Sequence, residues 1–360
     1  MTPAVAVIEQ IRADHNTWDM VYIGRRFAME GDRHESAEYR FITNLGIPFY
    51  SLSAGRVQRW ISLGAIVSLV KIPYGFIQAL WMLLVIRPNL IVSFGGYIAV
   101  PVAFAGWVLG IPSITHEQTG TIGLGNRLIS FVAKKVMVSD KKLVGQDNGK
   151  TVYTGLPLRK ALFDPPKTPS FPLKSGSPIL YITGGSTGAQ SLNEYVYRCL
   201  SSLVKDFTII HQTGERSFDR AREMKHTLPE QLREHYIIRP YLDVQDLAWI
   251  YVHALLIVGR AGANTVGEIA ALGAVALFIP LPWSGNAEQQ QNAETLRLVG
   301  SSEIIPQDQI TSRKMEKEIR RMVLHLARYR QNAISHKKHI PLDAAGNIVA
   351  VIKTFTAGRS

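Results

Sequence analysis

Residues 254–282 read ALLIVGRAGANTVGEIAALGAVALFIPLP, and this stretch decides the fold. Its first six residues and the segment 275–279 are short apolar runs, which are typical of buried strands. A glycine-containing turn follows the first run, helix-forming residues come next, and Gly273 ends them. The pattern predicts a strand, a helix and a second, parallel strand. The loop before the helix exposes free backbone N–H groups at the positive end of the helix dipole, so it suits a phosphate or another anionic group.

The same residues allow a simpler interpretation. Thr265 and Glu268 have the Thr-x-x-Glu spacing of a capping box, which stabilises a helix start by roughly 1 kcal/mol and binds nothing. Taken alone, this stretch leaves both interpretations open.

A second glycine-rich turn, GGSTGAQ at residues 184–190, is placed in the same way. It follows the apolar run 179–183 and precedes a helix that starts near Ser191. Glycines allow a backbone to approach a ligand closely, and Ser186 adds a hydroxyl among the amides. The turn lacks the Lys-Ser/Thr pair of a Walker A loop and the spacing of the dinucleotide fingerprint. Two such loops in one half of the chain predict a nucleotide pocket.

Composition excludes several classes of protein. The net charge is +12, yet only 19% of the 360 residues are charged and 46% are hydrophobic. The basic residues are dispersed without interleaved aromatics, so we expect no nucleic-acid partner. A basic surface with a high apolar content fits an anionic membrane surface or anionic substrates better. The single cysteine, Cys199, excludes a disulfide framework and a cysteine metal site, and no secretory signal is visible, so a reducing cytoplasm is expected.

Strand and helix patterns alternate along the whole chain, which predicts an α/β fold with two Rossmann-like lobes, parallel sheets and a cleft between the lobes. A Pro/Ser-rich stretch at residues 164–177 marks the linker region. We therefore assign residues 1–160 to an N-terminal lobe and residues 161–339 to a C-terminal lobe. The apolar tail, residues 340–360, is expected to pack back on the first lobe.

The most apolar stretch of the first lobe, residues 56–87, has two open interpretations. Its apolar run is shorter than the ~20 residues that span a bilayer, and we expect Pro73 to break it. It is either a buried core helix or a helix that dips into a membrane interface, anchored by Trp60, Trp81 and flanking cations.

Polar residues also gather where a strand of the first lobe ends. His116 and Glu117 follow the strand that ends at residues 114–115, and the carboxyl end of a strand is where ligands bind in open α/β sheets. They are candidate catalytic groups, with a hydrogen-bonded structural histidine as the alternative.

Seven segments together resemble one known family, and within each lobe they occur in the family's order. They are SFGGY (93–97), GIPSITHEQTG (110–120), TGLPLR (154–159), GGSTGAQSLN (184–193), HQTGE (211–215), GRAGANTVGEIAALG (259–273) and NAEQQQNA (286–293). They look like the MurG glycosyltransferases, which transfer N-acetylglucosamine from UDP-N-acetylglucosamine to undecaprenyl-diphospho-muramoylpentapeptide, converting lipid I to lipid II. The resemblance covers nearly the whole chain.

The resemblance implies a GT-B fold and an inverting hexosyltransferase of peptidoglycan biosynthesis, with roles in cell shape and cell division. Its implied partners are UDP-N-acetylglucosamine, lipid I and the anionic surface of the inner membrane, on whose cytoplasmic face it would lie as a peripheral protein. No cofactor or metal is implied, since the chain has no Asp-x-Asp motif.

By motif matching, the resemblance also implies the binding residues. They are Ser186 at a phosphate, Leu242 near the uracil, Ala263, Asn264 and Thr265 along the diphosphate, Glu268 at the ribose and Gln289 at the sugar, with Thr119 and Arg159 from the first lobe. Two of these positions depart from the family, which usually has Asn at Thr119 and an apolar residue at Asn264. Glu288 stands where Gln or His is usual.

The start of the chain departs further. In the family, a GGTGGH loop whose His is the proposed general base precedes a helix beginning with a segment like TPAVAV, and here Met1 falls immediately after that position. We therefore expect the first strand, its loop and the base to be missing, and the given chain to have little activity. The rival functions are a UDP-N-acetylglucosamine 2-epimerase and a non-catalytic UDP-sugar-binding protein.

Overall fold

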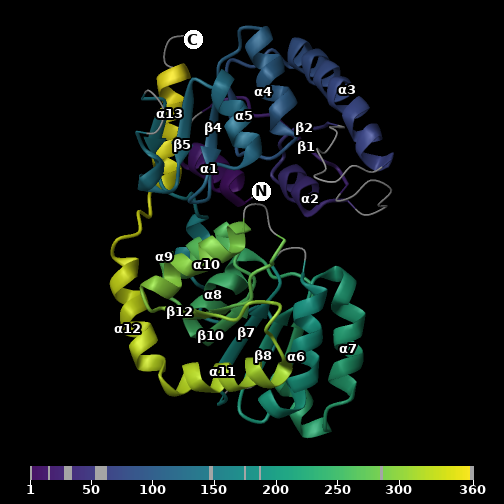
Figure 1. Ribbon diagram of the computed structural model, residues 1–360, viewed down its shortest axis with the longest axis vertical. Coiled ribbons are helices and arrows are strands. Elements are labelled where there is room, and N and C mark those ends of the chain that lie inside the picture. The colour runs from purple at the N-terminus through teal and green to yellow at the C-terminus, as the bar shows by residue number, and fades with distance from the viewer. Residues whose placement is uncertain are drawn as a thin grey trace. The chain divides into compact units, whose positions relative to one another are not determined.

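The computed structural model shows a chain of two compact units (Figure 1), Met1–Pro157 with Asp343–Ser360, and Leu158–Leu342. The structure describes residues 2–14, 17–27, 35–52, 63–145, 149–173, 176–185, 188–283 and 287–356. In both units the described strands pair only in parallel, apart from one isolated antiparallel bridge, and helices connect them. This confirms the predicted α/β class.

The second unit contains a six-stranded sheet in the order β12-β11-β10-β7-β8-β9. Its strands are β7 (Ile179–Thr183), β8 (Thr208–Gln212), β9 (Tyr236–Arg239), β10 (Ala254–Gly259), β11 (Ala276–Phe278) and β12 (Ser302–Ile304). The chain builds outward from β7 to β9, returns to the other side of β7 with β10, and continues to β12. The strand order therefore reverses between β7 and β10, which makes this pair the topological switch point.

Helices cover both faces of this sheet. They are α6 (Gln190–Leu203), α7 (Phe218–His226), α8 (Val244–His253), α9 (Ala263–Leu272), α10 (Glu288–Leu298), α11 (Ser312–Leu324) and α12 (Leu326–Lys337). Leu180 and Ile182 of β7 pack with residues of α6, α11 and α12, whereas Ile179 and Tyr181 pack with residues of α8, α9 and α10. Alternate residues of a strand point to opposite faces, so the near-continuous apolar run of β7 fits burial on both sides.

The first unit contains two parallel sheets, one with β1 and β2 and one in the order β3-β4-β5-β6. The strands are β1 (Tyr22–Gly24), β2 (Phe49–Ser51), β3 (Ile91–Ser93), β4 (Ser113–Glu117), β5 (Lys135–Val138) and β6 (Thr151–Tyr153). The helices are α1 (Thr2–Ala13), α2 (Ala37–Asn44), α3 (Leu63–Ile86), α4 (Ala99–Val108), α5 (Leu124–Val132) and α13 (Ala344–Thr356).

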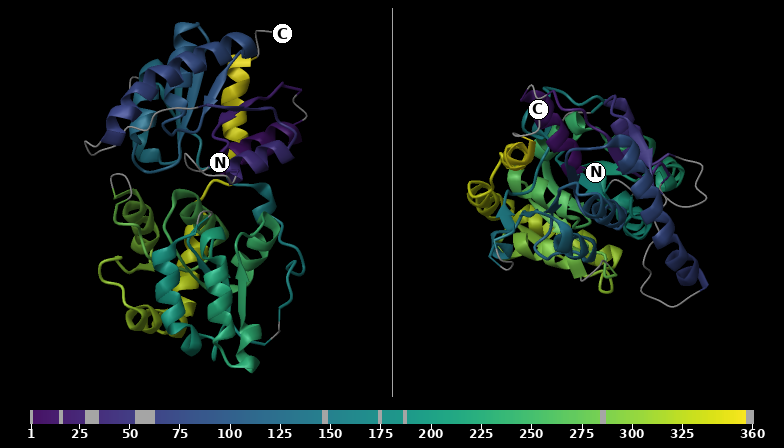
Figure 2. Two further views of the ribbon diagram at one scale, coloured as in Figure 1. Left: turned by 90° about the vertical axis from the view of Figure 1, so that its right-hand side faces the viewer. Right: turned by 90° about the horizontal axis from the view of Figure 1, so that it is seen from above.

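The C-terminal helix α13 lies against α1 in this first unit (Figure 2). Ile348 and Ile352 of α13 share a buried cluster with Val7 and Ile11 of α1. The apolar tail therefore packs on the first unit, although it follows the whole second unit in sequence.

The expected break at Pro73 is wrong, because α3 continues through this residue. Proline inside a helix costs about 3 kcal/mol. Packing offsets that cost, since Ala79, Met82 and Leu83 of α3 are buried against Val102 of α4 and its neighbours. Trp60 lies outside the described residues. Among the helices that the structure describes, none combines the length and the hydropathy that crossing a membrane requires.

Candidate functional site

Two glycine-rich turns flank the switch point of the second unit, one after β7 and one after β10. Gly184 and Gly188 are required by close packing: a Cβ on Gly184 would lie 2.2 Å from the Ala189 nitrogen, and one on Gly188 would lie 2.4 Å from the Thr213 oxygen. Gly188 also has a φ of 74°, which favours glycine. Because both turns follow the carboxyl ends of the strands at the switch point, they lie where ligands bind in open α/β sheets. Residues 186 and 187, and with them the candidate Ser186, lie outside the described residues.

The helix after the second turn has an uncapped N-terminus. Helix α9 begins at Ala263, and its N-cap Gly262 provides no side-chain hydrogen bond. Ala263, Asn264 and Thr265 thus form its first turn, where free backbone N–H groups gather. The capping-box interpretation of Thr265 and Glu268 is wrong, because Thr265 lies inside the helix rather than at the N-cap.

The carboxyl group of Glu268 is buried in the second unit. Tyr251 Oη donates a hydrogen bond of 2.8 Å to Glu268 Oε2, and the Tyr251 ring meets that of Tyr181 edge to face. Burial raises the pKa of Glu268 to about 7, while the hydrogen bond from Tyr251 and the charge of Arg159 oppose this rise. A carboxyl group with a pKa near neutrality is a functional-site candidate, because small changes in its surroundings alter its charge.

Arg159 belongs to the second unit, not to the first lobe where the sequence analysis placed it. The segment that follows it explains why: Leu162 is 1% exposed and packs with Trp249 and Ile250 of α8 in the second unit's core. Arg159 is therefore part of the second unit, where its positive charge lowers the pKa of Glu268.

Helix α10 is hydrogen-bonded to the turn after β10 and to the segment after β11. Gln289 Oε1 accepts a hydrogen bond of 3.0 Å from the Leu281 backbone N–H, and Asn292 Nδ2 donates one of 3.1 Å to the Ala261 oxygen. Gln289 and Asn292 are three residues apart and so share a helix face. The i, i+3 spacing in NAEQQQNA was the signal that could have identified Asn292 from the sequence.

Sequence reasoning also missed Arg260, which links three elements. Its Nη1 donates to the Ile279 oxygen at 2.8 Å, and its Nη2 donates to Ser191 Oγ at 2.7 Å. Arg260 follows β10, Ile279 follows β11 and Ser191 lies in the first turn of α6. The turn composition alone gave no signal for this buried arginine.

The candidate Leu242 lies in the interior of the second unit. It is 1% exposed and packs in one cluster with Trp249, Ala261 and Val266. Ala261 belongs to the turn after β10, so Leu242 is part of the buried cluster that includes this turn.

In the first unit, His116, Glu117 and Thr119 are engaged in hydrogen bonds with other residues of that unit. Glu117 accepts from Thr119 N and Oγ1, from Gly123 N and from Asn126 Nδ2 at distances between 2.9 and 3.1 Å. His116 is fully buried with Nε2 placed 2.9 Å from the Gly155 oxygen, and burial lowers its pKa to about 4. These contacts fit structural roles for both catalytic candidates.

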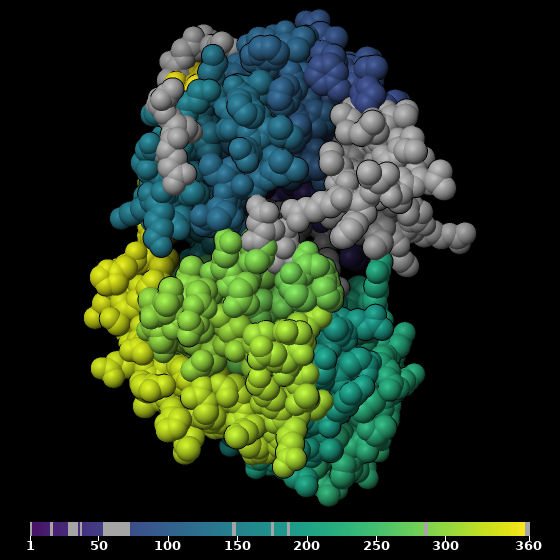
Figure 3. Space-filling view, in the orientation of Figure 1, coloured from purple at the N-terminus to yellow at the C-terminus, as the bar shows by residue number. Residues whose placement is uncertain are grey.

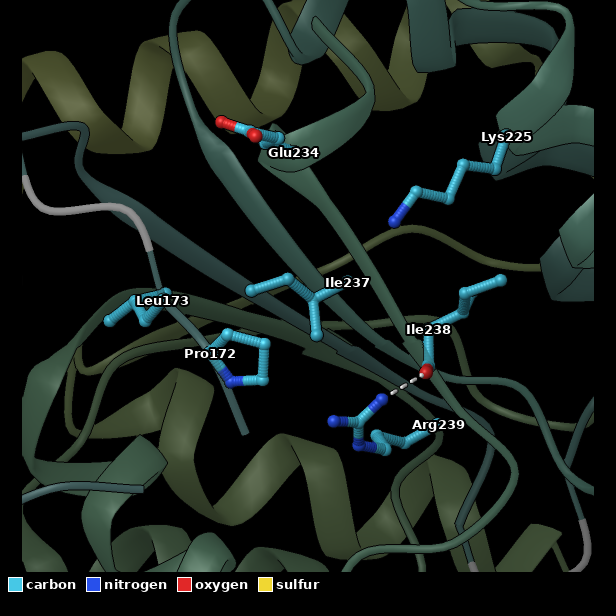
Figure 4. A pocket seen from close by; sticks show the side chains of 7 residues that line it. All are labelled: Pro172, Leu173, Lys225, Glu234, Ile237, Ile238 and Arg239. Carbon is cyan, nitrogen blue, oxygen red and sulfur yellow. Dashed lines mark hydrogen bonds between the residues drawn. The ribbon is translucent and has the colours of Figure 1, made fainter. Parts of the chain in front are cut away.

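A pocket of about 400 Å³ lies at the β9 edge of the second sheet, away from the switch point (Figure 4). Its lining residues are Pro172, Leu173, Lys225, Glu234, Ile237, Ile238 and Arg239. None of the predicted site residues lines it, and Arg239 directs Nη1 to the Ile238 oxygen. We therefore locate the candidate site at the glycine-rich turns.

The two halves of the chain match two family models. Residues 1–138 match the glycosyltransferase family 28 N-terminal domain, and residues 179–347 match its C-terminal domain. The UDP-N-acetylglucosamine–N-acetylmuramyl-(pentapeptide) pyrophosphoryl-undecaprenol N-acetylglucosamine transferase of Treponema denticola is 32% identical over 84% of this chain and 80% of its own. The chain belongs to the MurG family of glycosyltransferases. This confirms the resemblance and the hexosyltransferase class predicted from the sequence.

Solved structures agree on the fold. The crystal structure of Acinetobacter baumannii MurG is 23% identical, with a TM-score of 0.68 and coverage of 98% of this chain and 95% of that one. A putative UDP-N-acetylglucosamine 2-epimerase of Listeria monocytogenes is 13% identical, with a TM-score of 0.65 and coverage of 100% and 94%. The GT-B fold of the MurG family is thus confirmed, and the epimerase likeness is one of fold alone.

Proposed function

We propose that the protein transfers N-acetylglucosamine from UDP-N-acetylglucosamine to undecaprenyl-diphospho-N-acetylmuramoyl-pentapeptide, with inversion at the anomeric carbon. One observation carries the proposal: two glycine-rich turns follow the adjacent strands β7 and β10 at a switch point, and the helix that begins after the second turn carries the buried carboxyl group of Glu268. Membership of the MurG family supports it, because the relative from Treponema denticola is named for this transfer.

The donor would bind to the second unit. The first turn of α9, with Ala263, Asn264 and Thr265, offers free N–H groups to the diphosphate. Glu268 would accept hydrogen bonds from the ribose hydroxyls in its ionised form, with Tyr251 holding its second oxygen. Gln289 would meet the sugar from α10, and Arg159 adds positive charge on the side of Glu268.

In the reaction, an acceptor sugar hydroxyl attacks the anomeric carbon while the bond from that carbon to the UDP oxygen breaks. The hydroxyl proton passes to a base, and the bonding electrons leave with UDP, whose diphosphate gains negative charge. The N-termini of α6 and α9 would stabilise this charge, because their N-cap residues, Ala189 and Gly262, provide no side-chain hydrogen bond to the free N–H groups. We do not assign the base to His116 or Glu117, because His116 is hydrogen-bonded to the Gly155 oxygen and Glu117 accepts from Gly123 and Asn126.

The lipid acceptor requires contact with a membrane, and the first unit offers a suitable surface. Helices α3 and α4 pack side by side there, as do α4 and α5, and α3 and α4 contribute to the surface in Figure 3. The large apolar side chains exposed on these helices are Tyr74, Ile77, Trp81, Leu84, Val85, Trp107, Val108, Leu124, Leu128 and Phe131. A set of exposed apolar side chains of this size is typical of a surface that binds a partner or a membrane.

Exposed cations adjoin these side chains, namely Arg87, Arg127 and Lys134. They would be attracted to anionic lipids. We therefore propose that α3 has two roles, a core face and a membrane face, and that the protein lies peripherally on the cytoplasmic face of the inner membrane.

The test is a product assay with labelled UDP-N-acetylglucosamine and a lipid I analogue in vesicles. We expect Glu268→Ala to lower the yield of labelled disaccharide lipid about 10-fold or more relative to the unsubstituted chain, however low the activity of that chain is. Glu294→Ala, which removes a carboxylate on the surface of α10, is the matched control and should retain activity. Formation of the 2-epimer, or donor binding without any lipid product, would contradict the proposal.

A further inference from the structure

Arg260 is a buried cation at the candidate donor site. Only 6% of it is exposed, and it stands at the carboxyl end of the central strand β10. Its two terminal nitrogens donate to neutral oxygens, those of Ile279 and Ser191, and its Nε has no hydrogen-bond partner in the described part of the chain.

The guanidinium group has no counter-charge among the described residues. Its hydrogen-bond acceptors among the described residues are a backbone carbonyl and a hydroxyl, and burial lowers the pKa of Arg260 to about 10. Burying an arginine without an anion is costly, and proteins normally pair such a group or use it. By contrast, the exposed Arg297 on α10 has Glu294 as its ion-pair partner.

Two further observations at the same place indicate an anionic, polar ligand. The N-cap residues of α6 and α9, Ala189 and Gly262, provide no side-chain hydrogen bond, and Arg260 donates to Ser191 in the first turn of α6. In addition, Asn264 Oδ1 in the first turn of α9 is buried without a partner among the described residues, and this acceptor suits a ligand hydroxyl rather than a phosphate. Buried polar atoms in native proteins are normally satisfied, so these orphaned groups fit a site that a ligand completes.

We propose that Arg260 is a positioning residue for the donor diphosphate: it supplies the positive charge beneath the phosphates and fixes the first turn of α6 through Ser191. This inference rests on the proposed function, because it concerns the same donor site. It also accounts for the unpaired buried charge, which the diphosphate would neutralise. As UDP leaves, the same charge would stabilise the additional negative charge on its phosphate.

The test compares how uridine, UMP and UDP bind to the full chain by calorimetry. The variants are Arg260→Gln and Arg260→Met, which are neutral, and Arg260→Lys, which keeps the charge. Arg297→Gln is the matched control. We expect either neutral variant to lose about 10- to 100-fold in UDP affinity while uridine affinity stays within about 2-fold. Arg260→Lys should keep most of the preference of UDP over uridine.

Uridine, UMP and UDP differ in their number of phosphates. Their relative affinities therefore show whether Arg260 acts through its charge on the phosphates or only through the fold. If both neutral variants keep the wild-type ratio of UDP to uridine affinity, or lose both affinities equally, the proposal for Arg260 is overturned. If only one neutral variant folds, that variant decides. A wild-type protein that binds uridine and UDP equally well overturns this inference alone, whereas one that binds no uridine nucleotide overturns the proposed donor site as well.

Discussion

The carboxyl ends of the strands are built differently in the two units. In the first unit, the charged group at the end of β4, Glu117, receives four hydrogen bonds from its own loop and from Asn126. In the second unit, the charged group after β10, Arg260, has no counter-charge among the described residues, and its Nε has no partner there.

This difference separates a scaffold from a binding site. A saturated carboxylate such as Glu117 holds a loop and has little hydrogen-bonding capacity left for a ligand. An arginine without a counter-charge near the N-termini of helices creates a positive electrostatic potential, which attracts an anion. The loop after β4 therefore stabilises the fold of the first unit. The turn after β10 contributes binding energy for a ligand.

Breaking the saturated network should have the largest effect on stability. Glu117→Ala leaves the buried Asn126 amide and the Gly123 N–H without their carboxylate acceptor, and we expect it to lower the free energy of unfolding by about 3 kcal/mol. Denaturant unfolding measures this change. UDP affinity should remain within about 2-fold, because the donor site is built by the second unit.

Glu35→Ala is the matched control for this prediction, since Glu35 pairs with Arg26 on the surface of the same unit. It should change stability by less than about 1 kcal/mol. Unchanged stability in Glu117→Ala, with lost UDP affinity, would reverse the roles assigned to the two loops.

The second prediction concerns pH. The pKa of Glu268 is about 7, and its ionised form accepts hydrogen bonds best, so the affinity for UDP-N-acetylglucosamine should rise about 10-fold between about pH 6 and pH 8. This ligand is preferred to UDP because its diphosphate does not titrate near neutral pH. Tyr251→Phe removes a hydrogen bond that lowers the pKa of Glu268, so the midpoint should move to higher pH. A pH-independent affinity in the wild type would contradict this role.

The same shift affects stability with a definite sign. The folded pKa of Glu268, about 7, lies above the ordinary value of 4.5, so the folded state holds this proton more tightly than the unfolded state does. Its contribution to stability is therefore complete at pH values below 4.5 and is lost as the pH rises to about 7. Glu268→Gln should remove this dependence, which unfolding at several pH values measures.

The smallest effect concerns the membrane surface of the first unit. Binding to anionic vesicles should weaken as salt increases, by about 1 kcal/mol for each cation that contributes. Trp81→Glu should reduce vesicle binding without changing UDP affinity, whereas Trp283→Glu, on the second unit, should not affect vesicles. Equal binding to neutral and anionic vesicles would remove the electrostatic part of the proposal.

The sequence predicted the elements that have strong local patterns. The runs ALLIVG and ILYIT form strands β10 and β7, and Gly273 ends α9 in the left-handed conformation. Apolar periodicity and glycine chemistry act within a few residues, so one sequence is enough to reveal them. The same local view misjudged Pro73, because packing against α4 is a tertiary effect.

The candidate site was less accessible to sequence reasoning. Tyr251 and Glu268 are seventeen residues apart and meet only in the folded unit, as do Arg260 and Ser191. Without those pairings, the Thr-x-x-Glu spacing had a plausible local explanation in a capping box. The position of Thr265 inside α9 excludes the capping box, and Glu268 is buried only once the unit has folded.

The affinity of Glu268→Ala for UDP-N-acetylglucosamine tests the central claim, that the second unit's buried carboxyl group belongs to the donor site. Calorimetry should show a loss of roughly 1 to 3 kcal/mol in binding free energy relative to the wild type. Glu268→Gln, which keeps an acceptor for Tyr251, controls for damage to the fold. An unchanged affinity in Glu268→Ala, with lowered thermal stability, would show that Glu268 serves the structure alone and would contradict this account of the donor site.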